Sequence, residues 1–60
     1  MDTKCQDIHF KTKEDEFVIR LVEVKAVRFL EVFIEVDYEI AGKKETVVFP
    51  KLAWSKLIID

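Results

Sequence analysis

Alternation of apolar and charged side chains between Val27 and Ile40 is the feature that most constrains how this chain can fold. One set of alternating positions is apolar or aromatic: Leu30, Val32, Ile34, Val36, Tyr38 and Ile40. The other set carries two aromatic residues and four acids: Phe29, Glu31, Phe33, Glu35, Asp37 and Glu39. A period of two is typical of a strand with one face on the core, whereas a helix would scatter the acids around its circumference. The stretch therefore predicts one long antiparallel strand with an acidic outer face.

Two further segments are predicted to pair with this strand. The segment Phe17 to Val24 carries apolar side chains on both faces, several of them β-branched, which favours a second strand. The connection Val24 to Val27 contains no Gly, Asn or Pro, so it is either a tight hairpin with an unusual turn or a bend within one long strand. On the other side, Gly42 supplies the positive φ that a turn over residues 41–44 needs, and Glu45 to Phe49 returns as a strand.

The C-terminal residues follow a helical spacing. Pro50 is tolerated in the first turn of a helix, where its missing N–H costs nothing. Trp54, Leu57 and Ile58 follow at intervals of three and four residues and are predicted to pack on the sheet. Leu52 and Ile59, seven residues apart, point to the opposite side of this helix and form a candidate subunit contact, with plain surface apolarity as the alternative.

These segments predict a single α+β domain. The expected fold is a small antiparallel β-sheet of three to four strands followed by one C-terminal helix. Residues 1–16 hold a short strand at Ile8 to Phe10 and a charged turn, residues 17–49 hold the antiparallel strands, and residues 50–60 form the helix.

The length of the chain predicts a homodimer. A domain of 60 residues buries only about 60% of the surface that its unfolded chain exposes, so natural domains of this size use a disulfide, a metal or a partner subunit. Cys5 is the only cysteine, which excludes a disulfide within one chain. Cys5 and His9 are too few ligands for a closed zinc site, so association with a second copy through Leu52 and Ile59 is the expected alternative.

The sequence indicates a binding protein without a cofactor rather than an enzyme. Ser55 is the only serine, His9 the only imidazole and Gly42 the only glycine, so no nucleophile–base pair and no phosphate-binding loop is present. Glu35 and Asp37 project from one strand face, and a solvated face is the expected reading of that pair. We expect no membrane segment and no secretory signal, and hence a cytoplasmic or nucleoid-associated protein.

Cations and aromatic residues in the chain predict a nucleic-acid surface. Sheets that expose aromatic side chains beside cations bind single strands by base stacking and phosphate contact. Phe29 and Phe33 are the candidate stacking residues. The candidate phosphate contacts are Arg20, Lys25, Arg28, Lys43 and Lys44.

The C-terminal two-thirds of the chain resembles a known family in the order of its motifs. These are an acidic-aromatic strand at residues 34–39, a Gly-Lys-Lys turn at residues 42–44, an apolar strand at residues 47–49 and Trp-Ser-Lys-Leu at residues 54–57. In this order they resemble the single-stranded-DNA-binding domain of the transcriptional coactivators called positive cofactor four. The resemblance implies a curved antiparallel sheet, a C-terminal helix, a dimer formed partly through that helix, and sheet channels that hold unpaired DNA. The small dimeric RNA-binding regulators of carbon storage are a weaker comparison, because their N-terminal signature is not present.

The acids of the long strand predict a different partner. Four carboxylates on one strand face repel phosphates, and the formal net charge of the chain is −2. The alternative hypothesis is therefore a small protein-interaction module or phage-type inhibitor that places this acidic face against a basic protein.

Overall fold

The computed structural model describes residues 5–60, and these residues form an all-β fold. The five strands are β1 (Gln6–Lys11), β2 (Glu16–Phe29), β3 (Phe33–Ile40), β4 (Lys43–Pro50) and β5 (Lys56–Ile59). They form one antiparallel sheet with the order β4-β3-β2-β1-β5. This order leaves β4 and β5 as the edge strands.

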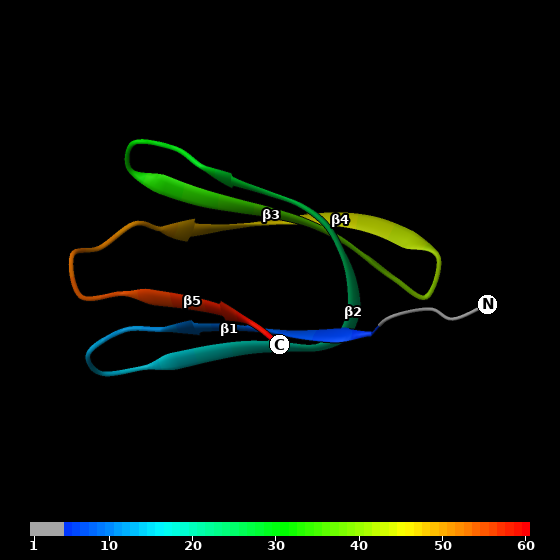
Figure 1. Cartoon of the computed structure of the whole chain (residues 1–60), viewed down its shortest axis with the longest axis horizontal. Coiled ribbons are helices and arrows are strands. Elements are labelled where there is room, and N and C mark those ends of the chain that lie inside the picture. The colour runs from blue at the N-terminus through cyan, green and yellow to red at the C-terminus, as the bar shows by residue number, and fades with distance from the viewer. Residues whose placement is uncertain (1–4) are drawn as a thin grey trace.

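The sheet folds over on itself because β2 is long and bent. The first half of β2 pairs with β1 and the second half pairs with β3, and Figure 1 shows β2 curving between these two halves. Its register shifts twice, once between Ile19 and Val22 opposite β1 and once between Val24 and Ala26 opposite β3. Each shift inserts an extra residue into β2, and such bulges bend a strand and increase its twist.

The first bulge contains a strained residue. Leu21 has a φ of 60°, in the left-handed region that costs a residue with a side chain roughly 1–2 kcal/mol. Its side chain is 69% exposed, so packing does not compensate for this cost. Instead the Leu21 N–H donates a 3.0 Å hydrogen bond to Oδ1 of Asp7 on β1, which satisfies a backbone group that the bulge removes from the ladder.

The core lies between the two halves of the folded sheet. Its buried residues are Ile8, Phe10, Val22, Ile34, Val36 and Phe49. Phe10 from β1 stacks on Phe49 from β4 with ring centroids 4.5 Å apart, and Phe17 meets Phe49 edge-on at 5.7 Å. Phe49 therefore joins the edge strand of one half to the centre of the other.

The expected strand between Glu45 and Phe49 is confirmed as part of β4. Ala41 and Gly42, with φ values of 52° and 81°, form the two-residue turn between β3 and β4. Positive φ at both central positions is the signature of a type I′ hairpin turn, whose twist matches that of the flanking strands. The short N-terminal strand is confirmed as β1, and the charged turn after it as residues 12–15.

The expected C-terminal helix is wrong, and with it the α+β class. Within residues 5–60 no helix forms, and the sheet has five strands rather than three to four. Pro50 ends β4, residues 51–55 form a turn, and the last residues pair with β1 as β5. An isolated helix this short is marginal, whereas β1 offers an unpaired edge and places Leu57 and Ile59 against the core.

The single long strand expected from Val27 to Ile40 is also wrong. A turn over residues 30–32 divides it into the end of β2 and the whole of β3. The Leu30 N–H donates to the Phe33 carbonyl at 2.8 Å, and the Lys51 N–H donates to the Val32 carbonyl at 2.8 Å. The bend within one long strand, which was one of the two alternatives for Val24 to Val27, is the one that β2 adopts.

No segment of residues 5–60 forms a helix of the length and apolarity needed to cross a membrane.

The strain at Leu21 predicts an unusual order of stabilities. Leu21→Asn and Leu21→Gly should raise the free energy of unfolding by up to about 1 kcal/mol, because both residues tolerate the left-handed region. Leu21→Val should lower it, because a β-branched side chain is more strongly disfavoured there. Urea denaturation measures these changes, and Leu21→Ala is the control for loss of the exposed side chain. A Val variant as stable as the Asn variant would contradict a left-handed residue at this position.

Candidate functional site: an apolar loop patch

Three loops meet at one end of the molecule. Figure 1 shows the β1–β2 loop, the β2–β3 loop and the β4–β5 loop at the left, with the β3–β4 hairpin turn at the right. Lys51 ties two of these loops together, since its N–H donates to the Val32 carbonyl and its Nζ donates to the Leu30 carbonyl at 3.2 Å. Residues 12–15 line a shallow depression with Leu52 and Trp54, which places the β1–β2 loop beside the β4–β5 loop.

Apolar side chains are exposed on these loops. We define the apolar loop patch by the exposed residues of the β2–β3 and β4–β5 loops and their borders: Phe29, Leu30, Val32, Phe33, Leu52 and Trp54. Phe29 is 64% exposed and Trp54 is 58% exposed, which is unusual for large aromatic side chains. Exposed apolar side chains gathered at one end of a molecule mark an interaction site more often than single residues scattered over its surface do.

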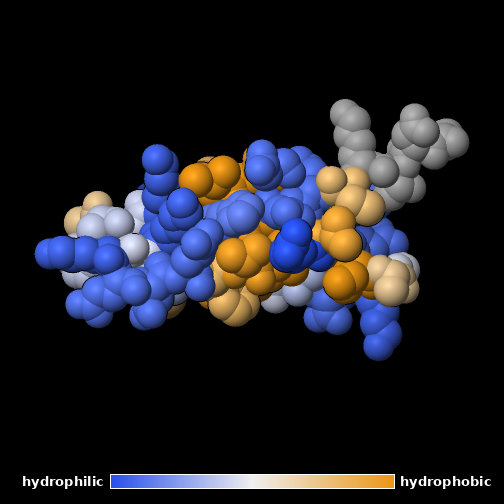
Figure 2. Space-filling view, turned by 90° about the horizontal axis from the view of Figure 1, so that it is seen from below, coloured by the Kyte–Doolittle hydropathy of each residue, from blue (hydrophilic) through white to orange (hydrophobic). Residues whose placement is uncertain are grey.

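A second apolar region lies on the side formed by β1 and the first half of β2. Phe17, Val18 and Leu21 are exposed there. Figure 2, seen from below the view of Figure 1, shows apolar surface between hydrophilic side chains on this side. These residues follow one strand and its bulge, and no loop contributes to them.

Phe29 and Phe33 are both exposed, as a stacking surface requires, but they do not share a sheet face. Phe29 lies opposite Ile34 in the register of β2 and β3, and Ile34 points into the core. Phe33 is the neighbour of Ile34 on β3 and so points to the other face. The turn at residues 30–32 breaks the period of two that had placed both aromatic residues on one face.

Arg28 is enclosed by acids on the outer face of β2 and β3. Its two terminal nitrogens donate to the Asp37 carboxylate at 2.8 and 2.9 Å, and its Nε donates to Glu35 at 3.0 Å. Thr46 on β4 donates a further hydrogen bond of 2.8 Å to Asp37. The hydrogen bonds to Asp37 and then Glu35 raise the pKa of Arg28. The hydrogen bonds from Arg28 and then Thr46 lower the pKa of Asp37 to about 2.

Lys25 neutralises the other end of the same face. As the extra residue of the second bulge, it places its Nζ 3.1 Å from Glu23 and 3.5 Å from Glu39. The hydrogen bond and charge of Glu23, and then Glu39, raise the pKa of Lys25. The face expected to be acidic is therefore largely a set of ion pairs within the chain, and of its four acids only Glu31 makes no ion pair among the described residues.

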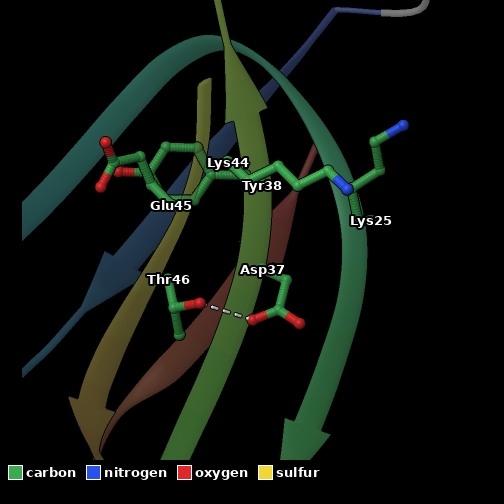
Figure 3. A pocket seen from close by; sticks show the side chains of 6 residues that line it. All are labelled: Lys25, Asp37, Tyr38, Lys44, Glu45 and Thr46. Atoms are coloured by element: carbon green, nitrogen blue, oxygen red, sulfur yellow. Dashed lines mark hydrogen bonds between the residues drawn. The ribbon is translucent and has the colours of Figure 1, made fainter. Parts of the chain in front are cut away.

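A polar depression lies beside these ion pairs. Figure 3 shows its lining of Lys25, Asp37, Tyr38, Lys44, Glu45 and Thr46, contributed by β2, β3 and β4. Asp37 is a poor general base here, because its pKa lies far below neutral and Arg28 occupies both of its oxygens. Within the lining, Thr46 donates a hydrogen bond to Asp37, and the ion-pair partners of Lys25 and Asp37 lie outside the depression.

The remaining predicted phosphate contacts lie far from the aromatic residues of the loop patch. Lys43 and Lys44 follow the β3–β4 turn, at the opposite end of a molecule whose longest extent is 38 Å. Arg20 lies next to the first bulge, and its Nε is 3.8 Å from Asp7. The structure brings Arg28 and Lys25 to one sheet face, but it does not gather the seven predicted nucleic-acid residues into one surface.

The two predicted dimer residues separate as well. Leu52 lies in the β4–β5 loop and belongs to the apolar loop patch. Ile59 lies in β5, opposite Ile8, and packs against the core of its own chain. The helical stripe that had joined them does not exist.

Sequence reasoning missed most of the apolar loop patch. Trp54 was assigned to the buried face of a helix, and Leu30 and Val32 to the buried face of a strand. One signal could have corrected the first assignment: Ile58 and Ile59 are β-branched and favour a strand over a helix. Nothing in the residues around the β2–β3 turn marks it, because it contains neither Gly nor Pro.

Metal ligands do not gather in the part of the chain that the structure describes: no three side chains of His, Cys, Asp or Glu lie together. His9 instead places its Nδ1 3.1 Å from Glu16, on the neighbouring strand. Cys5 is exposed ahead of β1.

Comparison with models of known protein families, with curated proteins and with solved structures gives no significant match. The resemblance to the single-stranded-DNA-binding coactivators therefore depends on the quoted motifs alone. One of those motifs, Trp-Ser-Lys-Leu, lies in a turn and in β5 instead of the helix that the resemblance implies.

The contacts of Asp37 with Arg28 and Thr46 predict how the free energy of unfolding falls at acid pH. The folded pKa of Asp37, about 2, lies below the ordinary value for an aspartate of 3.8, so the contribution of this group to stability is present above pH 4 and is lost as the pH falls toward 2. NMR titration of the side-chain carboxyl carbon should find this low midpoint in the wild type. The midpoint should rise in Arg28→Gln and rise by a smaller amount in Thr46→Val. An unchanged midpoint in Arg28→Gln would show that Arg28 does not hold Asp37 in solution.

Proposed function

We propose that this protein is a non-catalytic protein-binding module that contacts its partner through the apolar loop patch. The single observation that supports the proposal is the exposure of Phe29, Leu30, Val32, Phe33, Leu52 and Trp54 on loops that Lys51 ties together. Aromatic side chains such as these are enriched at the centres of protein interfaces, where they bury a large area at a small entropic cost.

The charges around the patch favour a protein over a nucleic acid. Glu14, Asp15 and Glu31 lie on the same three loops and outnumber Lys13 and Lys51. A phosphate backbone laid over the aromatic residues would approach these carboxylates and would release few counterions. A mixed polar rim around an apolar centre is the usual anatomy of a protein interface.

Single-stranded nucleic acid is the second candidate, and Lys43 and Lys44 favour it. Neither lysine makes an ion pair with any described residue. Arg28 and Lys25 count against this candidate, because a phosphate would have to displace the carboxylates that each cation already holds. Association of two copies is a third possible use of the patch. We place the protein in the cytoplasm, where a lone thiol such as Cys5 stays reduced.

Selection of binding peptides tests the proposal without a known partner. Random peptides displayed on phage would be selected on the wild-type chain alone, and the affinity of the selected peptides would then be compared between the wild type and a Phe33→Ser/Trp54→Ser variant. Selected peptides should shift the emission of Trp54, the only tryptophan, to shorter wavelength as its ring leaves water. Loss of these contacts should weaken binding by at least about tenfold, since residues at the centre of an interface contribute 1.4 kcal/mol or more.

Val18→Ser is the matched control, because Val18 is exposed on β2 away from the loops. It should leave peptide affinity unchanged. Peptides that bind the double variant as tightly as the wild type would refute the patch. Tight binding of labelled oligo-dT at low salt, weakened by Lys43→Glu and unaffected by Trp54→Ser, would instead establish the nucleic-acid candidate. A dimeric mass in light scattering that Trp54→Ser converts to a monomer would assign the patch to self-association.

A further inference from the structure

We propose that β4 accepts an extended, acidic segment of the partner as an additional strand of the sheet. The inference rests on the proposed function and specifies its partner, since the segment would continue from the apolar loop patch along β4. Strand addition of this kind obtains affinity from main-chain hydrogen bonds and specificity from alternate side chains.

The register of the β3–β4 hairpin shows which backbone groups of β4 are free. Ile40 and Lys43 close the two-residue turn, and such a closing pair exchanges both of its hydrogen bonds. Bonded pairs then recur at every second residue of β4, up to Phe49. The alternate positions, Lys44, Thr46 and Val48, direct their N–H and C=O groups away from β3.

Among residues 5–60, no other backbone group satisfies these outward positions. The backbone hydrogen bonds outside the strand ladders lie in the loops and between Asp7 and Asp60, and none of them involves residues 44, 46 or 48. β4 is an edge strand of eight residues without a bulge, and Thr46-Val47-Val48 has strong strand propensity. Such an edge is a template for pairing with another chain.

Pro50 is consistent with this arrangement. It falls in the same alternate set as Val48, at a position where an N–H would point outward. Proline is tolerated in edge strands at such positions, because no bond to the neighbouring strand is lost. It also marks the limit of the free edge, since an added strand finds no donor there.

The side chains at the outward positions connect the edge to the apolar loop patch. Val48 is 51% exposed on the outer face, and the next pair in the ladder on that face is Phe33 with Pro50. Phe33 belongs to the patch. A segment laid along β4 would therefore place apolar residues near Val48 and Phe33, and its other end would pass Lys44.

Charge selects an acidic occupant. The segment from Lys43 to Lys51 contains three lysines and one acid, Glu45. Glu39, which lies opposite Lys44 in the strand ladder, already forms an ion pair with Lys25, so it does not neutralise the charge of Lys44. A second copy of β4 would bring the same excess of lysines, whereas carboxylates of another chain would complement it.

The arrangement also predicts an orientation. A segment antiparallel to β4 begins beside Pro50 and ends beside Lys43, so its apolar half comes first and its acids follow. Antiparallel pairing suits this sheet, in which every described pair of strands is antiparallel.

The probe for this inference is a fluorescein-labelled peptide, Gly-Phe-Thr-Val-Thr-Val-Thr-Asp-Asp, with an amidated C-terminus. Anisotropy should show binding to the wild-type chain, and a version ending in Lys-Lys should bind at least tenfold more weakly. Two further versions carry N-methyl groups on alternate amides, one set facing β4 and the other facing away. Methylation of the amides that face β4 should abolish binding, because it removes the main-chain donors, and methylation of the amides that face away should leave binding intact.

Val48→Pro is the matching change in the protein. It removes an outward N–H without removing a bond to β3, and it should abolish binding of the acidic peptide. Val48→Thr, which keeps the N–H, should bind as the wild type does. If Val48→Pro fails to fold by circular dichroism, the two N-methylated peptides still decide the question on the wild-type chain.

The outcomes separate this inference from the proposed function. Loss of binding in Trp54→Ser together with equal binding of both N-methylated peptides would overturn strand addition and leave the patch as the binding surface. Unchanged binding in Trp54→Ser, together with loss of binding for only one of the two N-methylated peptides, would support the β4 edge and refute the patch. No binding of the acidic peptide, or equal binding of the Lys-Lys version, would overturn the acidic occupant. Dimers that form through β4 and are broken by Val48→Pro would assign the edge to a second copy instead.

Discussion

The bend in β2 is the constraint on which the rest of the structure depends. One strand serves both halves of the sheet, pairing with β1 before the bend and with β3 after it. Two bulges produce the bend, and one of them holds Leu21 in a strained conformation that Asp7 stabilises from β1. With β2 straight, the inner faces of the two halves would not meet, and Phe10 would not reach Phe49.

The same bend explains why the molecule has an apolar end and a free edge. Folding a five-stranded sheet once brings the β2–β3 and β4–β5 loops together and leaves β4 and β5 unpaired on one side. Within residues 5–60 the core contains six buried side chains, which is small for a domain that must fold alone. An apolar patch and an edge strand that both remain available to a partner fit a chain that gains stability on binding.

Charge on the outer face is arranged for cohesion within the chain. Arg28 holds Glu35 and Asp37 across β2 and β3, and Lys25 holds Glu23 and Glu39 at the second bulge. These exposed pairs add little stability individually, but they remove the acidic field that the strand pattern had indicated. Lys43 and Lys44 make no ion pair among the described residues and lie at the far end of the molecule from the aromatic residues, and this separation favours a protein segment over a nucleic acid.

Period-two patterns and the Gly42 turn were sufficient to predict β1, the β3–β4 hairpin and the apolar face of β3, because these features depend on residues close together in the chain. The exposure of Phe29 and Phe33 was also predicted, although not their placement on opposite faces. The β2–β3 turn could not be foreseen, since its carbonyls are satisfied by Lys51, about twenty residues away. The secondary structure of residues 56–59 also depends on a partner far away in the chain. These residues form β5 rather than a helix because they pair with the open edge of β1. Local pattern thus set which segments are strands, and long-range backbone pairing decided where they turn, what they cover and which surfaces remain free.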